Sequence, residues 1–357
     1  MMHIALSRSA IAMLIAITAS CGYDSNGPGL YDEPSVADPN EGLWVASGSD
    51  PAILRLSPSQ LLSNGRQVPS TTVTTSSATL FAFNALAFDS AGTMWIASAD
   101  DSLLLAFTPE VLATSGLSSA STVIAPTDRS LSAPAAVAFD RMQRLWVANF
   151  QTGTIVRFDR EQLALGGAQK AAVTVAGLTH PTALAFDASG SLWVADARAN
   201  VLVKYSAAQL EATASPTPEV VLSATEGSLA APFALAFDRV GKLWVANLGT
   251  STIVAFGSEQ LIATGSPAPQ IGLASSGADS FGIPVGLAFD ADGSLWVLSG
   301  DQGLHKFALP ALGATGKPEP SAQLSLNGHT LLSGIAFWPQ PPALTIDGDA
   351  RLRTSTR

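Results

Sequence analysis

The sequence is poor in charged residues, in cysteine and in long apolar stretches. Only 13% of its 357 residues are charged, yet 47% are hydrophobic, which is too many for a disordered chain. A single cysteine excludes an internal disulfide framework and a cysteine-based zinc cluster. The net charge of −10 argues against a nucleic-acid partner. Because the only long apolar run lies at the N-terminus, we expect a soluble body.

The first twenty residues have the layout of a secretory signal peptide, with Arg8 before an apolar stretch and small residues before Cys21. Residues 17–21 (ITASC) resemble the bacterial lipobox, in which the cysteine is lipidated and becomes the mature N-terminus, although Thr18 replaces the usual Leu or Val. The alternative is an ordinary signal peptide with an incidental cysteine. Gly22 stands where lipoproteins of the inner membrane often have Asp. The resemblance therefore implies an outer-membrane lipoprotein, facing either side, with residues 21–40 as a flexible tether.

Six copies of one unit make up the body of the chain. A variant of Leu-Trp-Val-Ala recurs every 47 to 52 residues, with its tryptophan at Trp44, Trp95, Trp146, Trp193, Trp244 and Trp296. The aspartate of an Ala-Phe-Asp lies six residues before each of the last five tryptophans, at Asp89, Asp140, Asp187, Asp238 and Asp290. A leucine follows each tryptophan by 16 or 17 residues. Landmarks that recur in register predict a repeat architecture.

Each unit predicts four short strands, A to D. Strand A is a Leu-Ala-Phe stretch such as residues 235–237, and the Gly-containing turn after it predicts a hairpin. Strand B carries the tryptophan, strand C alternates as in residues 253–256, and strand D is an outer run such as residues 220–222. A segment ending in Gln-Leu predicts one helical turn between C and D. Four strands per unit indicate an all-β, six-bladed propeller over residues 41–338.

The two ends of the repeat predict how the ring closes. The first tryptophan unit lacks a good strand A, whereas residues 334–337 form a spare strand A with no tryptophan unit after it. We therefore expect this C-terminal strand to complete the blade that begins at Leu43, which leaves no open sheet edge. Residues 339–357 then form a tail.

A family resemblance accompanies these motifs. Residues 284–290 (PVGLAFD) followed by 293–297 (GSLWV) resemble the repeats of NHL-type propellers and of senescence-marker/gluconolactonase-like propellers. The likeness covers nearly all of residues 41–338 and implies the fold, but propellers host many unrelated activities. A streptogramin-lyase-like activity would need a His/Glu constellation, which is not visible in the sequence.

The gluconolactonase-like enzymes take their divalent-metal ligands from the middle position of Pro-x-Gly, just before strand A. The matching residues here are Asn84, Ala135, Thr182, Phe233, Val285 and Ser333. None of them is a carboxylate, and a hard cation needs several oxygen ligands. We therefore expect neither a metal nor another cofactor, and we assign no catalytic residue.

Polar residues recur on the face formed by the B–C turns and D–A loops. The third residue after each tryptophan is polar, and it either contacts a ligand at the channel mouth or caps its own turn. Two histidines of D–A loops near the mouth could bind a ligand or act in acid–base chemistry, or be ordinary loop residues. The ligand-binding candidates are Asn84, Asn149, His180, Thr182, Asp196, Asn247 and His329.

These patterns favour a non-enzymatic, monomeric binding or scaffold propeller, anchored by lipid in the bacterial cell envelope, whose ligand is a protein, a glycan or a small molecule. One alternative is a lactonase-like hydrolase or lyase with its site at the channel mouth. Another is an architectural protein, which a channel plugged by small and apolar strand-A residues would favour. Tether and tail are expected on the face opposite the mouth, towards the membrane, where Arg351, Arg353 and Arg357 would meet anionic head groups.

Overall fold

The structure, a computed structural model, describes residues 38–48, 50–75, 83–223, 227–275, 281–300, 303–329 and 331–340. The expected signal peptide, Cys21, most of the tether and the tail beyond Gln340 lie outside these residues. Among the helices of the described residues, none has the length and apolar character needed to cross a membrane.

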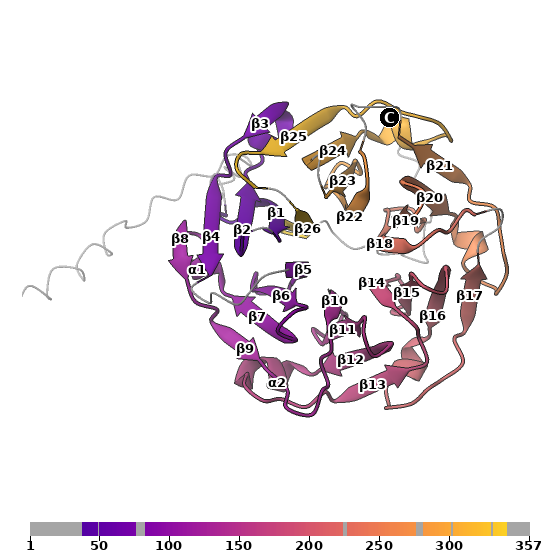
Figure 1. The fold of residues 1–357 in the computed structure, drawn as a ribbon. Coiled ribbons are helices and arrows are strands. Elements are labelled where there is room, and N and C mark those ends of the chain that lie inside the picture. Colours follow the sequence, from indigo (N-terminus) through magenta and orange to yellow (C-terminus); the bar gives the residue numbers. More distant parts are fainter. Residues whose placement is uncertain are drawn as a thin grey trace, which may run out of the picture. The chain divides into compact units, whose positions relative to one another are not determined.

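Six blades, each built on four antiparallel strands, surround a central axis, which confirms the predicted six-bladed propeller (Figure 1). Blade 1 contains β26 (Leu332–Trp338), β1 (Gly42–Ser47), β2 (Ala52–Leu56) and β4 (Thr71–Thr75). Blade 2 contains β5 (Phe83–Phe88), β6 (Met94–Ser98), β7 (Leu103–Phe107) and β9 (Thr122–Ile124). Blade 3 contains β10 (Pro134–Phe139), β11 (Leu145–Asn149), β12 (Thr154–Phe158) and β13 (Val173–Ala176).

The remaining three blades repeat this order from the axis outward. Blade 4 contains β14 (Pro181–Phe186), β15 (Leu192–Asp196), β16 (Val201–Tyr205) and β17 (Val220–Ser223). Blade 5 contains β18 (Pro232–Phe237), β19 (Leu243–Asn247), β20 (Thr252–Phe256) and β21 (Ile271–Ala274). Blade 6 contains β22 (Pro284–Phe289), β23 (Leu295–Ser299), β24 (Gly303–Phe307) and β25 (Ala322–Leu326). The predicted strands A to D correspond to these four positions in each blade.

Short helical turns join strands C and D, as predicted. They are α1 (Pro109–Leu112), α2 (Arg160–Leu165) and the 3₁₀ turns η1 (Gln60–Leu62), η2 (Ala207–Leu210), η3 (Ser258–Gln260) and η4 (Leu309–Leu312). The glutamine of the Gln-Leu motif closes the turn on both sides. Gln209 Oε1 accepts a hydrogen bond from Ser206 N at 2.9 Å, and Gln209 Nε2 donates to the Thr217 carbonyl at 2.7 Å. The leucine after it, Leu210, is buried.

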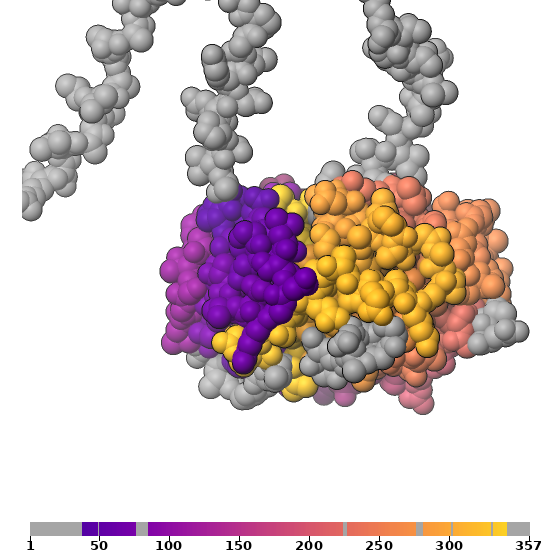
Figure 2. Space-filling view, turned by 90° about the horizontal axis from the view of Figure 1, so that it is seen from above, coloured from indigo at the N-terminus to yellow at the C-terminus, as the bar shows by residue number. Residues whose placement is uncertain are grey.

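The ring closes where the sequence predicts. Strand β26 pairs antiparallel with β1, with Leu43 opposite Phe337 and Ala46 opposite Gly334. Figure 2 shows the N-terminal and C-terminal segments of the described chain side by side. The C-terminal strand therefore forms the inner edge of the blade that the N-terminus begins.

A second closure, at the outer rim, was not predicted. Strand β3 (Gly65–Gln67) of blade 1 pairs in parallel with β25 of blade 6, and β8 (Gly116–Ser118) of blade 2 pairs in parallel with β4. Single parallel bridges make the same connection at Ile124–Gly167, Val175–Ala214, Leu222–Gly265 and Leu273–Gly316. Each blade thus covers the outer edge of the preceding one, which removes the edges that invite aggregation.

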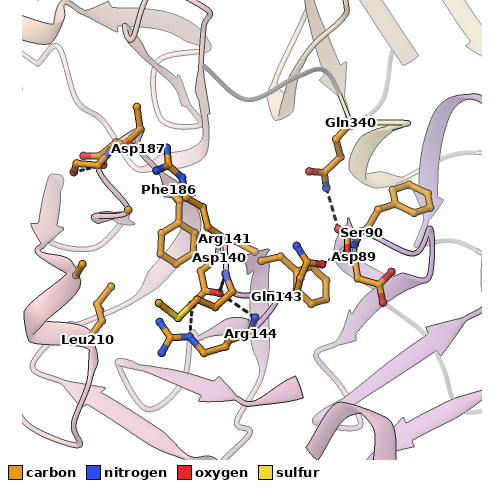
Figure 3. Close-up of a pocket in the computed structure, with 18 of the residues that line it drawn as sticks. Asp89, Ser90, Asp140, Arg141, Gln143, Arg144, Phe186, Asp187, Leu210 and Gln340 are labelled. Carbon is orange, nitrogen blue, oxygen red and sulfur yellow. Dashed lines mark hydrogen bonds and ion pairs between the residues drawn. The ribbon is translucent and has the colours of Figure 1, made fainter. Parts of the chain in front are cut away.

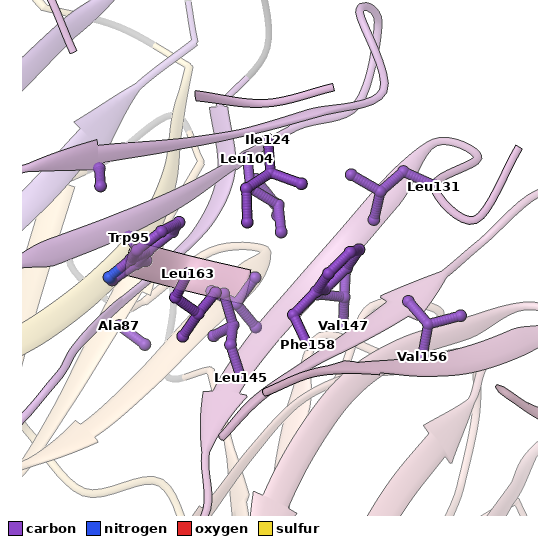
Figure 4. Close-up of a cluster of buried hydrophobic side chains, with 13 residues drawn as sticks. Ala87, Trp95, Leu104, Ile124, Leu131, Leu145, Val147, Val156, Phe158 and Leu163 are labelled. Atoms are coloured by element: carbon purple, nitrogen blue, oxygen red, sulfur yellow. The ribbon is translucent and has the colours of Figure 1, made fainter. Parts of the chain in front are cut away.

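The tryptophans pack between blades, and in the described residues five of the six also donate a hydrogen bond, Trp44 to the Asn40 carbonyl at 2.9 Å and four others to an aspartate. Figure 4 shows Trp95 of blade 2 in one apolar cluster with Leu145 and Val147 of blade 3. In blades 3 to 6 the indole N–H donates to the aspartate of the Ala-Phe-Asp motif at 3.0 to 3.2 Å. The other oxygen of that aspartate accepts two backbone N–H groups of the A–B turn, as Asp238 does from Val240 and Lys242. The six-residue spacing of Asp and Trp is therefore a framework motif.

Candidate functional site

The middle residue of each Pro-x-Gly position lies at a β-bulge in an inner strand. In blade 4, for example, Pro181 pairs with Asp196 and Ala183 pairs with Ala195, so Thr182 is the extra residue. Ala135, Thr182, Phe233, Val285 and Ser333 line the central channel. Asn84 occupies the corresponding backbone position in β5, but its side chain lies outside the described residues.

The channel between these residues is narrow, and its surface is more polar than apolar although most of the residues that line it are small or apolar. Its cavity measures about 110 Å³, well below the ~300–1,000 Å³ of ordinary ligand pockets. Thr182 is buried, and its hydroxyl donates to the Pro232 carbonyl of the next blade at 2.7 Å. The hydroxyl of Thr182 is therefore used in holding two blades together.

Asn149 and Asn247 hold the D–A loops of their own blades. Each is at most 1% exposed. Asn149 Oδ1 accepts from Ser132 N at 3.0 Å and Asn149 Nδ2 donates to the Ser130 carbonyl at 2.9 Å. Asn247 makes the equivalent bonds two repeats later, in blade 5, at 3.1 and 3.0 Å. These contacts correspond to the capping interpretation of the polar ring.

In blade 4 the carboxylate of Asp196 holds the D–A loop in the same way. Its carboxylate accepts from the backbone N–H groups of Thr179, His180 and Ala199, and from the Thr179 hydroxyl. Burial on its own would raise the pKa of Asp196, but these hydrogen bonds outweigh it and hold the pKa below its ordinary value. Asp196 and burial together raise the pKa of nearby Tyr205 to about 12, with burial the larger cause. The carboxylate is thus ionised and engaged at neutral pH.

The two candidate histidines belong to opposite sides of the ring. His180 precedes blade 4 and stacks on Phe150 with ring centroids 4.4 Å apart. His329 precedes blade 1, and its Nδ1 lies 2.8 Å from Asp50 Oδ2. Since blades 1 and 4 face each other across the axis, the fold does not make a catalytic pair of them. In the part of the chain that the structure describes, no three His, Cys, Asp or Glu residues gather as a metal site.

A cleft of about 710 Å³ opens on the opposite face, among the A–B turns of blades 2, 3 and 4 and the end of β26 (Figure 3). Its walls carry the aromatic residues Phe139, Phe186 and Trp338, which are all half-buried. Its volume lies within the range of ordinary ligand pockets. The polar residues that the repeat pattern predicts as a candidate site lie on the other face, and no sequence motif predicts this cleft.

The A–B turn of blade 3 departs from the repeat at the cleft. In blades 2, 4, 5 and 6 the fourth residue of the Asp-led turn is a glycine with φ between +80° and +82°. Blade 3 has Gln143 there, with φ of +60°, a left-handed conformation that costs a non-glycine residue about 1 kcal/mol or more. Gln143 Oε1 accepts from Ser90 N of blade 2 at 2.6 Å. The absence of this one glycine is the sequence feature that could have revealed the cleft.

An ion-pair network supports the outer wall of the cleft. Arg144 Nε lies 2.6 Å from Asp140 Oδ2, and Arg144 Nη1 lies 3.2 Å from Glu211 Oε2. The hydrogen bond from Arg144 is the largest cause of the lowered pKa of Glu211. Arg157, whose guanidinium lies over the Trp146 ring, also approaches Glu211, with Nη1 3.5 Å from Oε2. These four charged groups join blades 3 and 4.

Both ends of the described chain lie on the A–B turn face. Trp338 Nε1 donates to Asp38 Oδ2 at 2.7 Å, and Asn40 Nδ2 donates to the Pro109 carbonyl at 2.9 Å. Gln340 Nε2 donates to the Phe88 carbonyl at 3.0 Å. The tether was expected to reach Asn40, but the residues from Asp38 onward already contact the propeller.

The chain matches no known family model and no curated protein sequence. Among solved structures it is similar to a protein of unknown function from Bacteroides caccae, with 12% identity and a TM-score of 0.58 over 83% of this chain and 97% of that one. It is also similar to a chain of a nidogen/laminin complex, with 13% identity and a TM-score of 0.58 over 82% and 96%.

A virginiamycin B lyase from Staphylococcus aureus, with quinupristin, gives 10% identity and a TM-score of 0.49 over 82% and 91%. At these identities the comparisons establish the β-propeller fold alone. The resemblance to NHL-type or gluconolactonase-like repeats stays a prediction.

Proposed function

We propose that this protein is a non-enzymatic binding propeller, held in the bacterial cell envelope by a lipid on Cys21. The observation that carries the proposal is the use of the polar side chains at the channel mouth. The side chains of Asn149, Asp196 and Asn247 form hydrogen bonds with their own loops, and the Thr182 hydroxyl donates to the neighbouring blade. Since these four described candidates serve the fold, we expect a partner to bind at the surface or in a cleft.

The anchoring part of the proposal is supported by the lipobox-like residues 17–21 and by the position of Asp38. The described chain begins on the A–B turn face, so a tether that precedes Asp38 would join the propeller there. That face would then turn towards the membrane, and the face of the B–C turns would point away from it.

Lipidation is tested by feeding an expressing bacterium a clickable fatty acid. We expect a labelled protein in the membrane fraction for the wild type and an unlabelled one for Cys21→Ser. Ser20→Ala serves as a control that leaves the cysteine in place. Equal labelling or equal fractionation of Cys21→Ser and wild type would refute the anchor.

The non-enzymatic part is tested by elemental analysis of the purified protein and by melting curves with and without a chelator. We expect no stoichiometric divalent metal and an unchanged melting temperature. A stoichiometric metal whose removal lowers the melting temperature would favour the lactonase-like alternative instead.

A further inference from the structure

We infer that the cleft on the A–B turn face binds a small amphipathic anion, a compound with an aromatic or apolar body and one acidic group. This inference rests on the proposed binding function and gives it a site and a ligand class. It places the site on the face opposite the channel mouth.

The residues that line the cleft favour a ligand with an aromatic or apolar body. Phe139, Phe186 and Trp338 come from blades 3, 4 and 1 and present half-buried rings to the same space. Leu210 and Met142 also line it, and Met142 is 69% exposed. Aromatic walls with an adaptable methionine at the rim suit a flat apolar ligand.

Arg141 is the residue that would bind the acidic group of the ligand. Figure 3 shows its side chain extending along the cleft towards Phe186 and Asp187. Its guanidinium donates to the backbone carbonyl of Ala188. Within the described ranges no carboxylate lies within ion-pair distance of this guanidinium, which has five N–H donors in a planar fork suited to a carboxylate, sulfonate or phosphate.

The acidic residues around the cleft are already partnered. Asp140 bonds Arg144 and Trp146, and Glu211 is held by Arg144 and Arg157. Asp187 accepts bonds from its own turn and from Trp193. Asp89 accepts from Ala91 N and Thr93 N. Arg141 is therefore the cation of this cleft that is available to a ligand.

The blade 3 turn supports the same site independently. Residues 141–143 are Arg-Met-Gln, whereas the corresponding residues of blade 4 are Ala188, Ser189 and Gly190. Eight described residues other than glycine have a positive φ, but among the five Asp-led A–B turns only that of blade 3 keeps such a residue in place of the glycine, at a cost in stability. The exception falls in the turn that carries Arg141, the cleft-lining cation without an ion pair in the described residues.

Two fluorescent probes with the same rings test the inference. Anilinonaphthalene sulfonate carries one negative charge, and phenylnaphthylamine is its neutral analogue. We expect the sulfonate to bind the purified wild-type protein with one saturable site. Arg141→Gln should raise its Kd by about fivefold or more while changing the Kd of the neutral probe by less than about twofold. Arg141→Lys should restore part of the loss.

Matched variants locate the site. Arg239 has the same place in the blade 5 turn, so Arg239→Gln removes an equal charge outside the cleft and should leave both dissociation constants unchanged. Ala207, an exposed residue of the cleft rim, should block both probes when replaced in Ala207→Trp. Melting curves confirm that each variant is folded.

Three results would overturn the inference. The first is equal binding of both probes that Arg141→Gln does not alter, and the second is no binding at all. The third is binding that arises only when residues 341–357 are removed, which would assign the cleft to the chain's own tail. A stoichiometric metal found in the elemental analysis above would refute the non-enzymatic function and leave the probe titrations unchanged, so the two failures are distinguishable.

Discussion

The two faces of the propeller use their polar residues differently. On the face of the B–C turns, a polar residue recurs three positions after every tryptophan, and in blades 3, 4 and 5 it holds its own loop. On the face of the A–B turns the repeat is equally regular in four blades but is broken in blade 3, beside a cleft. In this molecule, repetition marks the framework and a departure from it marks the candidate site.

The largest effect is expected from opening the ring on which both faces depend. A chain that ends at Ser333 loses β26, and with it the inner edge strand of blade 1. We expect no cooperative melting transition, together with aggregation through the exposed edge of β1. A chain that ends at Gln340 should melt like the full chain. Equal melting of the two truncated proteins would contradict the closure.

The framework role of the B–C face is tested at Asp196. Asp196→Ala removes the acceptor of three backbone N–H groups, two of which, on the exposed residues Thr179 and Ala199, water can reach, so we expect a loss of about 1–3 kcal/mol in the free energy of unfolding by urea. The exposed turn residue Asp292 is the control, and Asp292→Ala should change stability little. A ligand-contact residue without a structural role would show no such loss.

The Asp–Trp bond of the A–B face is tested by comparing blades 5 and 2. Trp244 donates to Asp238, whereas the indole N–H of Trp95 is buried without a hydrogen-bond partner in the described structure. Both Trp→Phe changes lose ring volume, but only Trp244→Phe also breaks a bond to a carboxylate. We expect Trp244→Phe to cost about 1–2 kcal/mol more in urea unfolding. An equal loss in the free energy of unfolding would show that the bond between Trp244 and Asp238 does not stabilise the protein.

Acid should weaken the framework through its buried carboxylates. The pKa values of Asp196 and Asp290 are lowered in the folded protein; burial opposes the shift in both, and hydrogen bonds outweigh it. Each of these carboxyl groups has a lower pKa in the folded protein than in the unfolded chain, where it lies near 4. Ionisation therefore stabilises the folded protein at pH values above about 4, and this contribution is lost as the pH falls from there through the folded pKa. The stability difference between wild type and Asp196→Asn should therefore shrink from pH 6 to pH 3. A constant difference would contradict the charged role.

The sequence predicted what repeats and missed what does not. The six tryptophans, the Ala-Phe-Asp aspartates and the spare strand at residues 334–337 were enough for the blades and for their closure, since each landmark recurs six or nearly six times. The outer parallel bridges could not be predicted because their short segments, such as Gly65–Gln67, pair with another blade and carry little apolar pattern. The cleft could not be predicted because the aromatic residues that line it, such as Phe186, also occur in the other repeats. Only Gln143 and its neighbours differ from the repeat.

An exchange of the blade 3 turn separates the framework of the A–B face from its candidate site. Replacing the blade 3 turn by that of blade 4 combines Arg141→Ala, Met142→Ser and Gln143→Gly and keeps the ion pairs of Arg144. We expect the melting temperature to stay within about 2 °C of wild type or to rise, because the glycine relieves the left-handed strain, while the affinity for the anionic probe falls at least about fivefold. A melting temperature lowered as far as in Asp196→Ala, with probe binding intact, would show that this turn belongs to the framework.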